Sequence, residues 1–307
     1  MPLDYTRDIL CEYVCGVLKL DIGSIKEITV LKCAVAASDK TDIHYRITAG
    51  VFLDSDDDEK RISFIRRNRG AVYAENFKYD IPKSTLSKRP VIVGFGPAGM
   101  FAALVLAQAG AMPIVLERGK EVDLRLKDIT AFQNGGKLCE ESNVQFGEGG
   151  AGAFSDGKLK KGLVDGRKHK ILTEFVSAGA PENILYLEKA HIGSDLLRVA
   201  VKNLRRKIIS LGGEVLFSSK FTKIIRKNGK VCSLGYVADG EYKEIECDNV
   251  ILAIGHSARD TFLMLQNRNI AMEQKSFSVG ARIEHSQEMI NKSQYGKAYK
   301  KLPAADY

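Results

Sequence analysis

Three glycines near the start of an apolar stretch have the type and spacing needed to hold a dinucleotide. Residues 91–99 read VIVGFGPAG, a predicted strand that turns into a helix. Gly94 permits the sharp turn, Gly96 lets the backbone approach a pyrophosphate, and Gly99 lets the helix pack closely on the sheet. The helix N-terminus then offers unpaired N–H groups and a partial positive charge to the phosphates. The spacing therefore predicts a dinucleotide site.

An acidic residue completes this pattern. Glu117 ends the next predicted strand, where its carboxylate can accept hydrogen bonds from the adenosine ribose hydroxyls. A carboxylate in that place disfavours the 2′-phosphate of NADP. We include its neighbour Arg118, together with Pro97 and Ala98 at the start of the helix, among the predicted cofactor-binding residues. The alternative is a glycine turn in an ordinary βαβ unit that binds no cofactor.

Three further segments carry a resemblance to a known family. They are NVQFGEGGAGAFSDGKL at 143–159, VILAIGHSARD at 250–260 and FSVGARIEH at 277–285. With the glycine motif, these segments resemble the bacterial FAD-dependent dehydrogenases (the NAD(FAD)-utilising dehydrogenase family), relatives of the glutathione-reductase-type flavoproteins. The resemblance covers roughly residue 90 to the end and is weaker over the N-terminal part. It implies that the dinucleotide is FAD.

The glycine-dense segment fits a place beside a flavin. Residues 147–157 contain five glycines in eleven residues, so the backbone can lie against a planar ring or a phosphate chain. We therefore predict that Gly149 and Gly150 contact the cofactor. Ser155 and Lys158 would place a hydroxyl and a cation near the ring, where a cation stabilises the reduced flavin. The alternative is a glycine-rich surface loop.

Three other predicted contact residues come from the resemblance. Ala253-Ile254-Gly255 matches the strand-end "A-T-G" signature of two-dinucleotide flavoproteins, with Ile254 in place of threonine. Ala253 and Gly255 are therefore predicted cofactor contacts, without a side-chain hydrogen bond from residue 254. Val215 resembles the position whose backbone contacts the adenine.

Catalytic residues are left open by the sequence. His191, His256 and His285 each follow a predicted strand or loop near the cofactor-like segments, and an imidazole beside the flavin could transfer a proton. A structural or surface role is the more frequent one for such histidines, so none is assigned to catalysis.

The pattern of apolar residues predicts an α/β fold with two parts. Residues 1–85 are predicted to form a small α+β domain, and residues 86–307 a Rossmann-like FAD-binding domain that includes part of a substrate domain. The stretch 91–116 lacks charged residues, but its glycines and prolines divide it into strand, helix and strand rather than a membrane span. No late Gly-Asp strand follows Gly255, whereas family members continue further. We therefore expect the chain to be incomplete at its C-terminus, which would affect turnover and solubility.

Composition limits the remaining function classes. The chain has 307 residues, 45% hydrophobic and 27% charged, as is usual for a soluble globular protein. Its six cysteines form no C-x-x-C pair or metal-ligand spacing, and the N-terminus lacks the apolar region of a signal peptide. These features predict a cytoplasmic protein with free thiols and no metal. The net charge of +8 is spread along the chain, so we do not predict nucleic-acid binding.

The function that these observations favour is an FAD-dependent, dehydrogenase-like oxidoreductase with an unidentified small-molecule substrate. NAD(P)H is allowed as electron donor, although no second G-x-G-x-x-G motif indicates a nicotinamide domain. Two alternatives stay open: a non-catalytic flavin- or nucleotide-binding protein, and an FAD-dependent RNA-modifying enzyme. The oligomeric state is not predicted.

Overall fold

The chain packs as two units in a computed structural model. The description covers residues 1–53, 71–72, 79–154, 166–188, 190–281 and 283–305. Unit 1 comprises Met1–Lys78, Leu185–Ala190 and Ser276–Tyr307, and unit 2 comprises Tyr79–Ile184 and His191–Lys275. Dense contacts define packed units rather than independently folding domains, so the predicted domains 1–85 and 86–307 stay a prediction.

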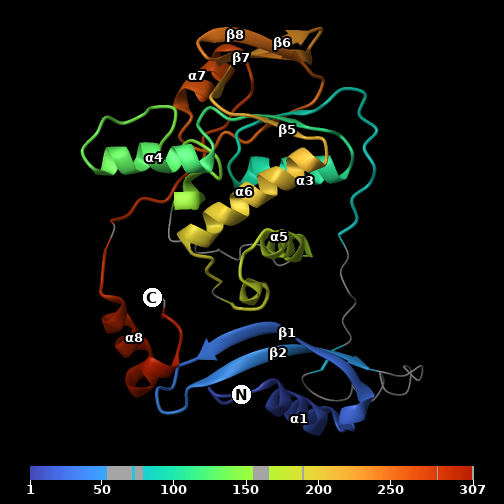
Figure 1. Cartoon of the computed structure of the whole chain (residues 1–307), viewed down its shortest axis with the longest axis vertical. Coiled ribbons are helices and arrows are strands. Elements are labelled where there is room, and N and C mark those ends of the chain that lie inside the picture. Colours follow the sequence, from blue (N-terminus) through green and yellow to red (C-terminus); the bar gives the residue numbers. More distant parts are fainter. Residues whose placement is uncertain (54–70, 73–78, 155–165, 189, 282, 306–307) are drawn as a thin grey trace. The chain divides into compact units, whose positions relative to one another are not determined.

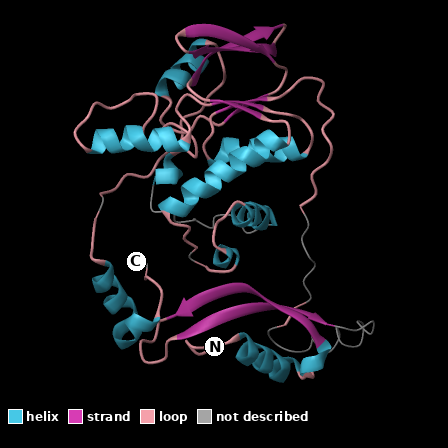
Figure 2. Cartoon of the chain, in the orientation of Figure 1, coloured by secondary structure: helices cyan, strands magenta, loops and turns pink. Residues whose placement is uncertain are grey.

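Helices and strands follow one another along both units (Figures 1 and 2). The helices of four residues or more and the strands are α1 (Arg7–Leu18), β1 (Ile25–Ala36), β2 (His44–Leu53), β3 (Val91–Val93), α3 (Pro97–Gln108), β4 (Ile114–Leu116), α4 (Val122–Gln133), η2 (Ala151–Phe154), α5 (Gly166–Ser177), η3 (Glu182–Leu185), α6 (Ser194–Ser210), β5 (Glu214–Leu216), β6 (Ser219–Lys227), β7 (Lys230–Ala238), β8 (Glu241–Glu246), β9 (Val250–Leu252), α7 (Arg259–Asn267), α8 (Gln287–Tyr295) and η4 (Gly296–Lys301).

A parallel sheet forms the centre of unit 2. Its strand order is β5-β4-β3-β9, with Val91 opposite Ile114 on one side and Val250 on the other. All residues of β3 and β4 are buried, which explains why these strands are continuously apolar. Together with the helices around it, the sheet confirms the predicted α/β fold class.

Helices α3 and α6 pack on one another beside this sheet (Figure 1). Helix α3 contacts β3, β4 and β9, and α6 contacts β5. Small and apolar side chains allow this close packing: Ala103 and Leu104 of α3 and Ala200 and Leu204 of α6 are fully buried. The helix that opens at the glycine motif is therefore held firmly over the sheet.

A second, antiparallel sheet has the order β6-β7-β8. Asn228 and Gly229 join its first two strands with φ values of 52° and 77°, which are typical of a tight hairpin turn. Phe221, Ile224 and Leu234 from this sheet share one apolar core with Val91 and Val93 of the parallel sheet. The two sheets thus contribute side chains to the same apolar core.

Unit 1 contains a two-stranded antiparallel sheet, β1-β2, with α1 and α8. Helix α1 begins after Thr6, whose hydroxyl accepts a hydrogen bond from the Ile9 N–H at 3.3 Å. Leu10, Leu18 and Ile28 are buried in this unit. A short bridge also pairs Cys33 with Leu187, so residues 185–190 belong here.

The predicted elements around the glycine motif are confirmed. The uncharged stretch 91–116 forms β3, α3 and β4, and within the described residues no helix has the length and apolar character needed to span a bilayer. The sequence did not predict α4, β8, α7 or α8. Ser155 and Lys158, two of the predicted cofactor contacts, lie outside the described residues.

Candidate dinucleotide-binding site

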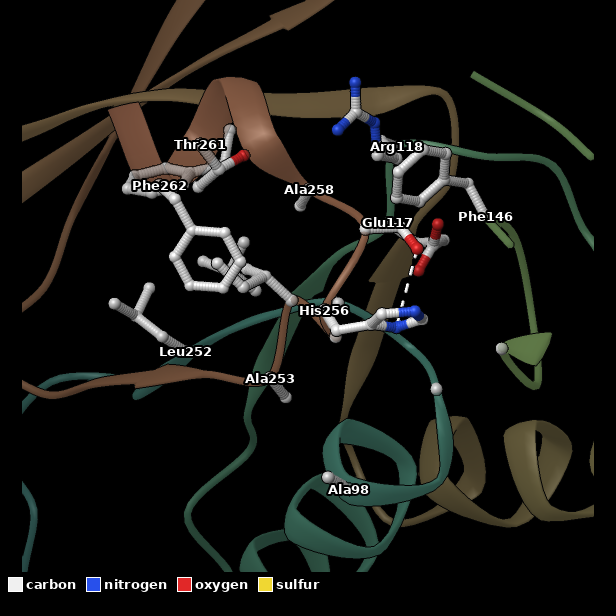
Figure 3. A pocket seen from close by; sticks show the side chains of 18 of the residues that line it. Ala98, Glu117, Arg118, Phe146, Leu252, Ala253, His256, Ala258, Thr261 and Phe262 are labelled. Carbon is white, nitrogen blue, oxygen red and sulfur yellow. Dashed lines mark hydrogen bonds between the residues drawn. The ribbon is translucent and has the colours of Figure 1, made fainter. Parts of the chain in front are cut away.

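A cavity of about 560 Å³ opens at the carboxyl ends of the parallel strands (Figure 3). Gly94 follows β3, Glu117 follows β4 and Ala253 follows β9, and all three line it. Ligands in open parallel sheets bind in this place, because the strand ends and the helix N-termini meet there. The volume is in the range of small-molecule and cofactor sites.

The first glycine segment, residues 94–99, forms one wall of the cavity. Gly99 has no room for a side chain, because a Cβ added to it would overlap the carbonyl oxygen of Gly94. Gly96 and Ala98, by contrast, line the cavity. The two glycines therefore have different roles, as predicted: Gly99 allows α3 to pack closely, whereas Gly96 faces the cavity.

The N-terminus of α3 has the features of an anion site. Gly96 is the N-cap and provides no side-chain cap, Pro97 occupies the first turn, and no acidic residue lies in that turn. Within the described part of the chain, the N–H groups of Ala98 and Gly99 have no hydrogen-bond acceptor. Ala98 lines the cavity, whereas Gly99 does not. A phosphate in the cavity can therefore take the Ala98 N–H together with the positive end of the helix dipole.

Glu117 fastens three backbone segments together. Its side chain is buried, and its Oε2 accepts a hydrogen bond from the Phe95 N–H at 2.7 Å. Its Oε1 accepts from the N–H groups of Gly119 at 2.8 Å and Gly147 at 3.0 Å. A carboxylate offers about four lone-pair sites, so one remains for a ribose hydroxyl. Glu117, which is predicted to bind the cofactor, therefore also holds these backbone segments together.

The second glycine segment, residues 147–151, packs against the first. The Gly149 N–H donates to the Phe95 carbonyl at 2.9 Å. Gly150 has a φ of +61°, and an added Cβ would lie 3.0 Å from Gly96 Cα. Gly150 and Ala151 both line the cavity. The two glycine segments, which are far apart in the sequence, therefore form one continuous wall.

A buried arginine from α4 holds the second glycine segment. Arg125 is 0% exposed and lies in α4. Its Nη1 donates to the carbonyl oxygens of Glu148 at 2.7 Å and Gly150 at 2.8 Å, and more weakly to Gly147 at 3.3 Å. Its Nε donates to Asn143 O at 2.8 Å.

Arg125 is not among the site residues predicted from the sequence. A signal was nevertheless present, because Val122, Arg125 and Ile129 form the buried stripe of α4. A charged residue in the middle of an apolar stripe at helical spacing needs buried partners, and here those partners are backbone carbonyls. This stripe becomes apparent only once residues 122–133 are placed in a helix.

Charged side chains form a network at the edge of the cavity. Arg118 donates to Glu141 at 2.6 Å and to both carboxylate oxygens of Asp260 at 2.9 Å, and its guanidinium lies 4.2 Å from the centre of the Phe146 ring. Lys220 binds the same two carboxylates, Glu141 at 2.7 Å and Asp260 at 2.9 Å. These hydrogen bonds lower the pKa of Asp260 well below its usual value.

Figure 3 shows how the wall residues are distributed. Glu117, Arg118 and Phe146 lie on the right of the view, and Leu252 and Phe262 lie on the left. The cavity therefore has a polar side at the end of β4 and an apolar side at the end of β9 and the start of α7. This asymmetry suits a ligand that has a polar part and an apolar part.

Most of the predicted contacts come together on this wall. The cavity is lined by Gly94, Gly96, Pro97, Ala98, Glu117, Arg118, Gly150, Ala253 and Gly255. Gly99, Gly149 and Val215 are not among the lining residues, and Val215 pairs with Val115 inside the sheet. Ser155 and Lys158 lie outside the described residues. The positions beyond Val215, such as Ser219 and Phe221, reach the cavity instead.

The three candidate histidines separate in the structure. His256 lines the cavity, and the neighbouring Ser257 Oγ lies 3.5 Å from its Nδ1 and 3.1 Å from Gln145 Oε1. His191 and His285 are not among the lining residues. The histidine that the structure brings to the cavity is therefore His256.

Comparison with known proteins gives two family matches. Residues 88–264 match the family described as pyridine nucleotide-disulphide oxidoreductase, and residues 276–307 match a family described as FAD-dependent protein, C-terminal domain-like. An uncharacterized protein of Clostridium beijerinckii is 45% identical over 312 residues, an alignment that covers 100% of this chain and 57% of that protein. The chain thus spans little more than half the length of this relative.

Solved structures show weaker likeness. The THI4 protein of Thermovibrio ammonificans is 20% identical, with 60% of this chain and 64% of that chain covered and a TM-score of 0.40. The glycerol-3-phosphate dehydrogenase of Bacillus halodurans, solved with FAD, is 16% identical over 55% of this chain and 34% of its own, with a TM-score of 0.32. Similarity at this level supports no inference about ligand or reaction.

Proposed function

The chain belongs to the pyridine nucleotide-disulphide oxidoreductase family, and on that premise we propose that it is an FAD-dependent oxidoreductase of dehydrogenase type that holds FAD in the cavity at the ends of β3, β4 and β9. The observation that carries this proposal is the wall made by the N-terminus of α3 and Gly150, where the Ala98 N–H has no acceptor among the described residues and Glu117 lines the same cavity. A dinucleotide needs an anion site next to a ribose acceptor, and these residues provide both.

The residues present fit the ADP half of FAD. The Ala98 N–H at the start of α3 would bind the diphosphate, and the remaining lone-pair site of Glu117 would accept a ribose hydroxyl. Phe221 and Leu265 give the cavity an apolar region that suits the adenine. When bound, the flavin would supply two-electron transfer, which is the cofactor's chemistry rather than the protein's.

The protein's own part is to bind, orient and protonate. The charged network of Arg118, Glu141, Lys220 and Asp260 fixes the edge of the cavity, because each cation contacts both carboxylates. His256 is the titratable lining residue that we propose as proton donor or acceptor. Ser155 and Lys158 stay proposed contacts of the flavin ring.

We propose NAD(P)H as the electron donor and a small molecule as the substrate. The donor is supported by the family membership, which is an analogy at the level of the fold. None of the six cysteines lines the cavity, so nothing among the described residues supports a disulfide of this chain as the electron acceptor. The activity of the longer relative is a separate matter, since the chain covers 57% of it.

The first test is a visible absorption spectrum of the purified chain, followed by calorimetric titration with FAD. We expect flavin bands after purification or on addition of FAD, and FAD in the supernatant after heat release. The Gly99→Ala variant should not bind, whereas Gly152→Ala should bind normally, because its added Cβ meets no atom within 4 Å. A folded, colourless wild-type chain that takes up no added FAD would overturn the proposal.

A further inference from the structure

Arg125 binds the second glycine segment through the carbonyl oxygens of that segment. It donates to Gly150 O at 2.8 Å, and the C=O and N–H of a trans peptide unit point in opposite directions. The N–H that shares this peptide unit belongs to Ala151, so it points away from Arg125. Ala151 lines the cavity, and no acceptor for its N–H exists among the described residues.

The charge of Arg125 strengthens that donor. Burial lowers the pKa of Arg125 to about 10, which leaves the guanidinium cationic at neutral pH. A cation on a peptide carbonyl polarises the same peptide unit, so its N–H becomes a better hydrogen-bond donor. Gly150 also packs against Gly96, the N-cap of α3, so the Ala151 N–H lies near the anion site of that helix.

A purely structural side chain does not explain Arg125 well. Its Nη2 is buried and has no hydrogen-bond partner in the described part of the chain, and its guanidinium lies 4.6 Å from the centre of the Phe154 ring. A buried orphan donor costs stability, and an apolar side chain would avoid that cost. Packing alone therefore does not explain why a cationic side chain, Arg125, occupies this position.

We propose that Arg125 is a positioning residue for the dinucleotide diphosphate: it fixes the Gly150–Ala151 peptide so that the Ala151 N–H is a second donor to the diphosphate, opposite the N-terminus of α3. This inference rests on the proposed function, because it assumes a dinucleotide in the cavity. The inference adds the Ala151 N–H as a donor and Arg125 as the residue that orients it, and neither belongs to the glycine motif at 94–99.

The direct test replaces the Ala151 amide with an ester by incorporating the corresponding α-hydroxy acid. This change removes one N–H and leaves the side chain in place. Binding of ADP and FAD should weaken about tenfold or more, because a hydrogen bond to a charged group is lost. Adenosine, which has no diphosphate, should bind within about twofold of its wild-type affinity, measured by ligand-observed NMR titration.

Arg125→Lys tests the support of that donor. An ammonium keeps the charge but cannot reach the same set of carbonyls. We expect the ratio of ADP to adenosine affinity to fall as it does in the ester variant, and the double variant should lose little more, since both changes act on one donor. Glu174→Gln is the matched control, because it removes a buried carboxylate elsewhere in unit 2 and should leave the ratio unchanged.

The outcomes separate the two proposals. If the wild-type chain binds neither ADP nor FAD, both the proposed function and this inference fail. If it binds them and the ester variant binds ADP like the wild type, the inference alone fails. An equal loss of ADP and adenosine affinity in both variants would also overturn it, because that result indicates general damage to the cavity.

Discussion

The two glycine segments of the cavity wall are fastened in different ways. The first, residues 94–99, lies directly between β3 and α3, which set its path, and it has one further hydrogen bond, from the Phe95 N–H to Glu117. The second, residues 147–151, is fixed by side chains from elsewhere, Glu117 after β4 and Arg125 in α4. The segments meet where Gly150 packs on Gly96.

This difference shows that a backbone donor can be placed locally or from a distance. A helix N-terminus presents its N–H groups wherever the helix begins, so a short motif is sufficient. An irregular loop has no such rule, and its peptide units must be oriented by side chains that bind their other ends. The first segment should therefore fail by steric overlap, and the second by loss of remote partners.

The largest effect is expected for Gly99→Ala in the first segment. The added Cβ overlaps the Gly94 carbonyl, so α3 must move away from the turn. We expect a loss of at least about 3 kcal/mol in the free energy of unfolding and no FAD binding. Urea denaturation and FAD titration measure the two quantities. A variant of normal stability would show that the first segment is less tightly packed than its geometry indicates.

Glu117→Gln should loosen both segments at once. The amide keeps one acceptor oxygen but turns an NH₂ group toward backbone N–H donors from Phe95, Gly119 or Gly147. We expect a loss of about 3 kcal/mol in the free energy of unfolding, because buried charge-assisted hydrogen bonds are broken. Hydrogen exchange should reveal faster exchange at Phe95 and Gly147 together. Faster exchange at only one of them would show that the segments are not coupled through Glu117.

Low pH should weaken the contacts at the C-terminus of α3, the helix that follows the first segment. Burial raises the pKa of Glu174, but hydrogen bonds from Lys170, Lys207 and Gln108 outweigh it and lower the pKa to about 2. Gln108 is the last residue of α3. Because the folded pKa lies below the usual value of 4.5, the stabilisation is present above pH 4.5 and is lost as the pH falls toward 2.

Glu174→Gln should therefore cost about 2 kcal/mol at pH 7 and much less near pH 3. Unfolding by urea at both pH values, for the variant and the wild type, checks this. The exposed pair of Arg89 and Glu214 provides the control, since Glu214→Gln should change stability by less than about 1 kcal/mol. Equal losses at the two pH values would contradict the assigned role of the Glu174 carboxylate.

The smallest change in stability is expected for Gly96→Ala, which separates ligand binding from folding. An added Cβ would lie 3.7 Å from Gly150 Cα, an ordinary contact, so the two segments can still pack. The methyl group would nevertheless enter the space beside the diphosphate. We expect stability within about 0.5 kcal/mol of the wild type and FAD affinity lowered about tenfold. Unchanged affinity would place the diphosphate away from Gly96.

The sequence by itself determined the first segment, because every requirement of that turn is local. Gly94, Gly96 and Gly99 stand at fixed offsets between an apolar strand and an apolar helix, and Glu117 ends the following strand. Such offsets convert directly into geometry, since a strand, a tight turn and a helix each have a set rise and direction. The α/β fold class and the position of the cavity follow from the same pattern.

Only the tertiary structure decided the second segment and its partners. The glycines of 147–151 allow many backbone directions and do not select one, and Arg125 lies in a helix that the sequence did not predict. The adenine contact expected at Val215 depends on the path of the chain after β5, and residues such as Ser219 reach the cavity instead. In each case the deciding contact joins residues far apart in the chain, so chain packing sets it and local spacing does not.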